Sequence, residues 1–138
     1  MDFKYLEHTA DAEFIAYGRT VDEAFANAAR ATFGLMVDLA KVRPAESREI
    51  RLAAGSLDDL LFDWLSELLY LVEVDRLIFS QFDVAIAEDG DYRLTAVARG
   101  EKVRPGHGVF LHVKAVTYHD LRVEKRNNVY EAQVLLDI

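Results

Sequence analysis

Near Leu77 the apolar residues of the chain change their spacing for the rest of the sequence, from the repeat of a helix to the repeat of a β-strand. Before Leu77, two segments place apolar residues three and four positions apart, which is typical of helices buried along one face. After Leu77, apolar and polar residues alternate, which is typical of half-buried strands. Because strand patterns also precede each helical segment, this order predicts an α+β fold, in which two α-helices pack against an antiparallel or mixed β-sheet.

Both helical segments begin with a capping residue. Thr20 and Glu23 fit the capping-box pattern, in which each side chain accepts a hydrogen bond from a free backbone N–H. The helix that follows fades near Asp38. Ser56 precedes two aspartates, which the helix dipole favours in a first turn, and this second helix runs to about Glu73. Its apolar stripe is so wide that we expect it to be the central helix.

Further stretches have the alternation or the bounded apolar run of a strand. They cover residues 3–7, 13–17, 49–52, 82–86, 92–98, 110–121 and 129–138. Asp89-Gly90 and Asn127-Asn128 predict hairpin turns, and Gly18 ends the second strand where a side chain would hinder the chain. The chain has no internal repeat and no linker, so we expect residues 1–138 to form one domain.

A Gly-rich loop between two of these strands, within residues 100–110, carries Lys102, Arg104 and His107. Basic side chains of exposed loops are commonly solvated or in contact with a partner protein. We expect this of all three residues, and the sequence assigns the loop no further role.

Composition excludes several classes of function. The net charge of −8 leaves little electrostatic basis for direct nucleic-acid binding and favours a cation or a basic protein as partner. The absence of cysteine excludes disulfides, thiolate nucleophiles and iron–sulfur clusters, so a metal must be held by oxygen or imidazole. The chain has no run of about 18 apolar residues and no secretory signal, which predicts a cytoplasmic protein without a membrane segment.

Familiar catalytic and nucleotide-binding motifs are also absent. No serine lies in a G-x-S-x-G pattern, so a nucleophilic triad is not predicted. The glycines form neither a P-loop nor a dinucleotide-binding fingerprint. We therefore expect neither a nucleophilic catalyst nor a dedicated nucleotide site.

The stretch LEHTADAEF, near the start, turns on His8 and Asp11 where a hairpin would normally turn on Gly, Asn or Pro. A third candidate is Asp137, a carboxylate inside the apolar stretch VLLDI, because a buried carboxylate needs a cation or hydrogen-bond donors. If the first and last strands are neighbours, Asp137 lies beside the turn, and the terminal carboxylate of Ile138 is close by.

Two interpretations of these residues remain open. An imidazole with two or more carboxylates suits calcium, magnesium, manganese or zinc, and the predominance of acidic oxygen favours calcium or manganese. Alternatively, His8 and Thr9 only cap a turn, and Asp137 is an exposed residue at a strand end.

The stretch VKAVTYHDL, residues 113–121, contains the other polar candidates. Strand alternation places Lys114, Val116, Tyr118 and Asp120 on one face and His119 on the other. Adjacent strand residues point apart, which disfavours an acid–base pair of His119 and Asp120. Lys114 lies among apolar residues, so its ammonium should extend to solvent or pair with a carboxylate such as Asp11 or Asp137.

Five stretches together resemble the archease family. They are LEHTAD, AYGRTVDEAFANAA, LLFDWLSELLYL, VKAVTYHDL and VLLDI, in the family's order and over essentially the whole chain. The resemblance implies a non-catalytic protein that assists the tRNA-splicing RNA ligase of the RtcB type. That ligase uses GTP and manganese through an enzyme-bound guanylate, and archeases are understood to promote its guanylylation and its repeated turnover.

The resemblance also implies site residues. It implies a divalent-metal site, often described with calcium, built from the HTAD turn and the C-terminal aspartate, which here are His8, Asp11 and Asp137. Lys114 matches a position linked to function in relatives. Ligase activation is therefore expected to depend on Asp11, Lys114 and Asp137.

Two further functions compete with ligase activation. One is a small metal-dependent hydrolase, in which the metal held by His8, Asp11 and Asp137 polarises water and His119 shuttles protons. The other is a chaperone or a modulator of a tRNA methyltransferase, a role that has also been attached to the family. A cofactor protein should be inert alone on phosphoesters, whereas a hydrolase should not.

Overall fold

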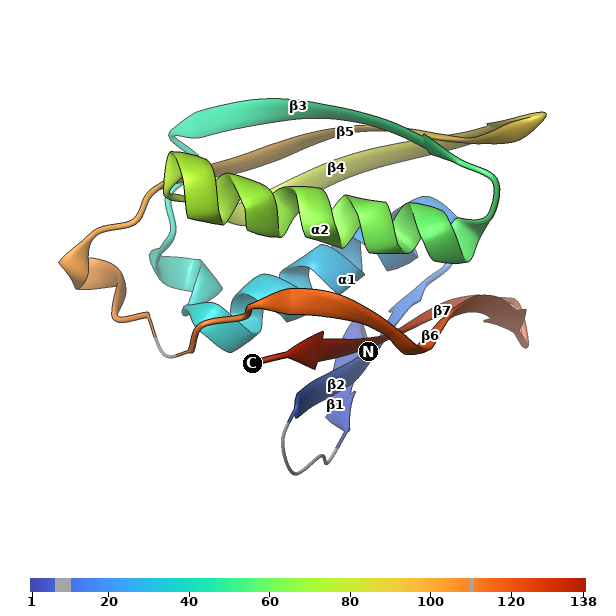
Figure 1. The fold of residues 1–138 in the computed structure, drawn as a ribbon, viewed down its shortest axis with the longest axis horizontal. Helices are drawn as coiled ribbons and strands as arrows, with labels where there is room; N and C mark the ends of the chain where they lie inside the picture. Colours follow the sequence, from blue (N-terminus) through green and yellow to red (C-terminus); the bar gives the residue numbers. More distant parts are fainter. Residues whose placement is uncertain (7–10, 110) are drawn as a thin grey trace.

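The computed structural model describes residues 1–6, 11–109 and 111–138. Within these residues the elements follow the predicted α+β order (Figure 1). In chain order they are β1 (Phe3–Leu6), β2 (Asp11–Gly18), α1 (Val21–Met36), the 3₁₀ turn η1 (Leu39–Lys41), β3 (Glu46–Ala54), α2 (Leu57–Asp75), β4 (Leu77–Asp89), β5 (Asp91–Lys102), the 3₁₀ turn η2 (Pro105–His107), β6 (Ala115–Arg126) and β7 (Val129–Asp137).

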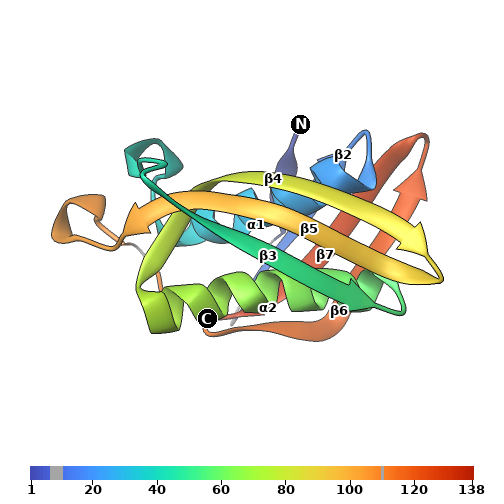
Figure 2. The ribbon, with the colours of Figure 1, turned by 90° about the horizontal axis from the view of Figure 1, so that it is seen from above.

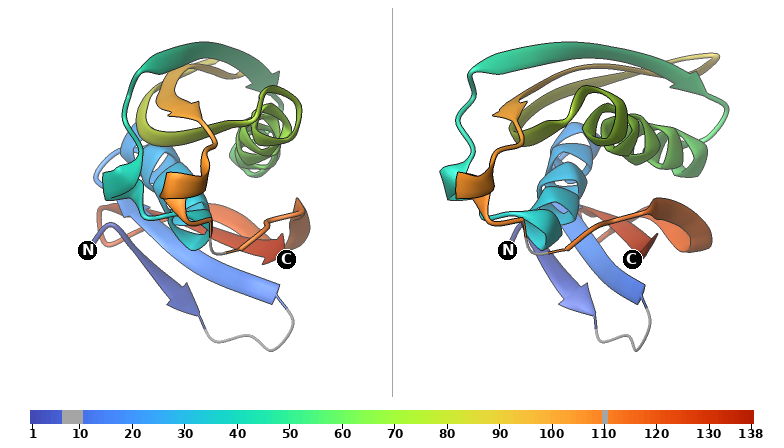
Figure 3. Two further views of the ribbon diagram at one scale, coloured as in Figure 1. Left: turned by 90° about the vertical axis from the view of Figure 1, so that its left-hand side faces the viewer. Right: turned by 60° about the vertical axis from the view of Figure 1, so that its left-hand side comes forward.

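The strands form two antiparallel sheets with the two helices between them. One sheet has the order β1-β2-β7-β6 and the other β3-β5-β4. Helix α1 packs on β2 of the first sheet and β4 of the second, and α2 packs mainly on β6 (Figures 1 and 3). Seen from above, the sheet of β3, β5 and β4 passes over α1, and α2 lies along its edge beside β3 (Figure 2). No helix in the described ranges is both long and apolar enough to cross a bilayer.

The predicted caps position both helices. The Thr20 hydroxyl accepts a hydrogen bond from the backbone N–H of Glu23, and the Ser56 hydroxyl accepts one from Asp59, each at 3.1 Å. Trp64 of α2 is fully buried, and its indole N–H donates to the backbone oxygen of Phe25 in α1 at 3.0 Å. This bond joins the two helices inside the apolar core, where an unpaired indole N–H would be costly.

The strand expected over residues 110–121 differs from the structure. Strand β6 starts at Ala115 and runs to Arg126, and Phe110 lies outside the described residues. Thr117 pairs with Leu135 and Arg122 with Gln133, so residues 118–121 all oppose the single position 134. Such a bulge interrupts the alternation of side chains.

The bulge lies between Thr117 and Arg122, so the predicted two-residue alternation of residues 113–121 cannot be extended through it to Asp120. Val116 is buried, whereas Lys114 and Tyr118 are exposed. Asp120 has a φ of +59°, in the left-handed region that few side chains other than Asn and Asp adopt. Because this turn re-aims the residues around it, a strict two-residue period does not apply here.

The loop after β5 was also predicted incorrectly at His107, which is buried with 1% of its surface exposed. The backbone N–H of Arg104 donates to its Nδ1 at 3.0 Å, so its Nε2 carries the proton and donates to Glu101 at 3.0 Å. The backbone N–H of Arg43 donates to the same carboxylate at 2.7 Å. These bonds fasten the loop to the chain before β3.

The same bonds set the protonation of Glu101. The hydrogen bond from Arg43 and then the one from His107 lower its pKa most, against the effect of burial, and Arg104 adds to them. The pKa of Glu101 is held at about 2. Lys102 and Arg104 are exposed as expected, although the Lys102 ammonium also donates to the backbone oxygen of Asp75 at 2.7 Å.

Candidate functional site

Two of the predicted site residues lie directly opposite each other. Asp11, the first residue of β2, is the register partner of Asp137, the last residue of β7. Directly opposed residues of an antiparallel pair project from the same face of the sheet, with Cβ atoms about 4.5–5.5 Å apart. The neighbour of the last strand is therefore β2, not β1, and the two carboxylates share one corner of the sheet.

The apolar core fixes this corner. Ala12 pairs with Leu136 and Phe14 with Val134, and all of these except Ala12 are buried. A slip of one residue would turn the whole apolar set of β2 or β7 toward the other face. Burial therefore holds the two strands in the register that opposes Asp11 to Asp137.

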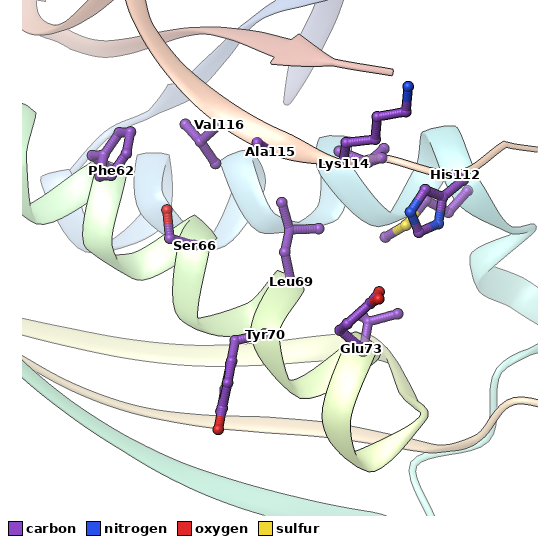
Figure 4. A pocket seen from close by; sticks show the side chains of 12 residues that line it. Phe62, Ser66, Leu69, Tyr70, Glu73, His112, Lys114, Ala115 and Val116 are labelled. Atoms are coloured by element: carbon purple, nitrogen blue, oxygen red, sulfur yellow. The ribbon is translucent and has the colours of Figure 1, made fainter.

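A third strand segment joins the corner through the backbone. Ala115, the first residue of β6, is the register partner of Asp137 on its other side. The backbone N–H of Lys114 donates to the backbone oxygen of Asp137 at 2.8 Å. The Lys114 side chain is exposed, and its ammonium points away from α2 toward the end of β7 (Figure 4). Of the two predicted alternatives for Lys114, extension toward solvent is the one observed.

The donor set of the corner fits a divalent cation. Like charges directly opposite each other across two strands repel, and a cation between them removes that repulsion. Carboxylate oxygens are the ligands that calcium, magnesium and manganese prefer. Among the described residues no group of three or more His, Asp or Glu side chains is placed to hold a metal. His8 and Thr9 lie outside the described residues, and Ile138 is half-buried against the core.

His119 and Asp120 do not belong to this corner. They lie in the β6 bulge, beyond Thr117, whose partner Leu135 is two residues before Asp137. The His119 side chain is 73% exposed, and its Nε2 lies 3.6 Å from an oxygen of Asp120. The expectation that these neighbouring side chains point apart was therefore wrong, but the contact is open to solvent, and it gives the proton-shuttle role of His119 no structural support.

A groove next to the corner was missed in the sequence. It has a volume of about 380 Å³ and lies between α2 and residues 112–116 (Figure 4). Phe62, Ser66, Leu69 and Glu73 line it from α2, and Lys114 and Val116 line it from the other side. The sequence signal was the four-residue spacing of Phe62, Ser66 and Tyr70, which the very wide apolar stripe of α2 obscured.

Comparison with known proteins shows the family to which a chain with this geometry belongs. The model of the archease protein family matches residues 3–138. The chain belongs to the archease family. The archease of Methanosarcina mazei is 48% identical over 139 residues, which cover 99% of this chain and 95% of that protein. The archease of Methanothermobacter thermautotrophicus is 39% identical, with coverage of 99% and 98%.

Solved structures show the same architecture. The solution structure of a Methanobacterium thermoautotrophicum protein superposes with a TM-score of 0.90 at 38% identity, over 99% of each chain. The crystal structure of a Thermotoga maritima protein, described as an archease and possible chaperone, gives a TM-score of 0.63 at 20% identity over 98% and 96% of the chains. At that identity the second comparison shows the archease fold alone.

Proposed function

We propose that this archease activates an RtcB-type tRNA-splicing RNA ligase by promoting its guanylylation and multiple turnover, without catalysing a reaction itself. The observation that carries the proposal is the register pairing of Asp11 with Asp137, to which Lys114 is joined by a backbone hydrogen bond. These are the three residues that the family resemblance connects with ligase activation. Residues far apart in the sequence are thereby brought to one exposed corner of the sheet.

The corner would hold a divalent cation through Asp11 and Asp137, with His8 as the further ligand implied by the family motif. Calcium is our first candidate, and manganese, magnesium and zinc have ligand preferences that also fit. A bound cation supplies positive charge where two carboxylates repel each other. The chain's own part is to hold these carboxylates in register at the rigid end of two paired strands.

Charge supports a protein partner of the opposite sign. The chain has a net charge of −8, and α2 carries six Asp or Glu residues and no Lys or Arg between Leu57 and Asp75. Electrostatic complementarity speeds association with a basic partner. An enzyme that binds RNA needs basic surface to hold phosphates, so it is a partner of suitable charge.

A turnover assay tests the proposal. Purified ligase is given excess RNA ends, GTP and manganese, with and without this chain. We expect product to exceed one equivalent of ligase only when the chain is present, and we expect the chain alone to leave the RNA and simple phosphoesters unchanged. Ligase that turns over equally well without the chain would refute the proposal, and hydrolysis by the chain alone would favour a metal-dependent hydrolase.

A further inference from the structure

The groove between α2 and residues 112–116 borders the strand segment that is bonded to the acidic corner. Lys114 lines the groove, and its backbone N–H bonds the backbone oxygen of Asp137. The Ser66 hydroxyl points from α2 into the space between the two segments (Figure 4). Lys114 therefore links the groove to the strand end that carries Asp137.

Aromatic surface borders the groove at one end. The ring of Phe62 stacks on that of Tyr118, with centroids 4.0 Å apart and planes 9° from parallel. Tyr118 is nevertheless 58% exposed, and so is Tyr70 on the next turns of α2. Large exposed aromatic side chains beside a cavity are typical of surfaces that a protein partner covers.

Acidic side chains surround the same surface. Glu73 lines the groove at its other end. Burial, and then the negative charges of Asp59 and Asp63, raise the pKa of the Tyr118 phenol, so both carboxylates act on this end of the groove. Like α2 as a whole, the helix side of the groove contains no basic residue. Complementary charge must therefore come from the molecule that docks.

We propose that this groove docks a segment of the ligase in which an apolar side chain lies between Lys or Arg residues. The inference rests on the proposed function, because the ligase is the partner named there. The apolar side chain enters between Ser66 and Val116, and the basic residues face Glu73 at one end and Asp59 and Asp63 at the other. A second copy of this chain is a poor occupant, since it would bring its own acidic α2 to the same surface.

Binding of the chain to purified ligase, measured by isothermal titration calorimetry, tests the groove separately from activation. Ser66→Arg fills the groove with a charged side chain, and Glu73→Lys reverses the charge at its end. We expect each to weaken binding at least about tenfold, a typical effect at the centre of an interface. Ser47→Arg on β3 and Glu88→Lys at the end of β4 are matched controls at exposed positions, and we expect both to bind as the wild type does.

A turnover titration with the same variants separates docking from activation. For the groove variants, we expect a higher concentration of the variant to be needed for half-maximal stimulation of the ligase, with the maximal stimulation unchanged. For Asp137→Asn, we expect a lower maximal stimulation. Wild-type chain that binds the ligase without stimulating it would refute the proposed function and leave the groove testable by binding.

Three results would overturn the docking site. They are unchanged affinity of folded Ser66→Arg and Glu73→Lys proteins, no binding of the wild-type chain to the ligase, and a wild-type dimer in sedimentation that Ser66→Arg dissociates. Melting temperatures within a few degrees of the wild type would show that the variants are folded.

Discussion

Asp11 and Asp137 face each other across β2 and β7, at the ends where the two strands meet the surface. One residue lies near the start of the sequence and the other near its end, so only the tertiary fold brings them together. Like charges at directly opposed positions of a sheet repel each other, and a cation bound between them offsets that repulsion. The pairing therefore predicts how the stability of the chain responds to a bound cation and to the loss of one of the two carboxylate charges.

Cation binding should stabilise the chain through these two carboxylates. Calcium at 100 times its dissociation constant should add about 2.7 kcal/mol to the free energy of unfolding, which is a rise of several degrees in melting temperature. Asp137→Asn should abolish that rise and, without calcium, should melt no lower than the wild type. Asp89→Asn, at the β4–β5 turn, is the control. Equal calcium stabilisation of the Asp137→Asn protein would remove Asp137 from the site.

Lys114 should matter for activation and not for stability. Because its side chain is exposed, Lys114→Gln should change the free energy of unfolding by less than about 0.5 kcal/mol. We expect the variant to bind calcium normally and to give clearly lower ligase stimulation than the wild type. Urea unfolding and the turnover assay measure the two quantities, and full stimulation by Lys114→Gln would contradict the role proposed for this residue.

The loop after β5 should give acid stability that depends on Glu101. The pKa of Glu101 is lowered to about 2 in the folded chain from an ordinary value of 4.5. Between these values the unfolded chain binds more protons, so the contribution is complete above about pH 4.5 and is lost as the pH falls toward 2. The stability difference between wild type and Glu101→Gln, measured by urea unfolding, should shrink over that range. A stability difference between the two proteins that does not change with pH would contradict this role of Glu101.

Gly100 should be intolerant of any side chain. A Cβ at this position would lie 1.8 Å from the backbone oxygen of Ile78, which cannot move aside without distorting β4. Gly100→Ala should therefore cost at least about 1–3 kcal/mol of stability. At Gly55 a Cβ would meet nothing within 4 Å, so Gly55→Ala should be neutral or stabilise by up to about 1 kcal/mol. Chemical denaturation of the two variants and of the wild type measures these changes in the free energy of unfolding.

Local chemistry made part of the fold predictable from the sequence. Thr20 and Ser56 cap their helices through bonds to residues three positions away, and the Asp89-Gly90 turn depends on Gly90, which has a φ of +78°. The α+β class followed from the same periodicities. The order of the strands in the two sheets could not be predicted in this way, because it depends on which faces of the elements bury each other and not on any single segment.

The predictions that were wrong also failed because of contacts and backbone geometry that no single sequence segment shows. His107 was expected to be solvated because it lies in a Gly-rich loop, but Glu101 and Arg104 complete its hydrogen bonds and allow it to be buried. The bulge in β6 depends on the positive φ of Asp120, a residue that also occurs in ordinary turns and strand ends. The pairing of Asp137 with Asp11 was predicted only on the condition that their strands are neighbours, and their roles as ligands stay a prediction.

The most direct test of the account is the amount of covalent guanylate on the ligase, measured with labelled GTP and manganese after one round of ligation. Wild-type chain should restore the guanylylated form, Asp137→Asn should not, and Asp89→Asn should match the wild type. Restoration by Asp137→Asn at the wild-type level would contradict the claim that the paired carboxylates of β2 and β7 activate the enzyme.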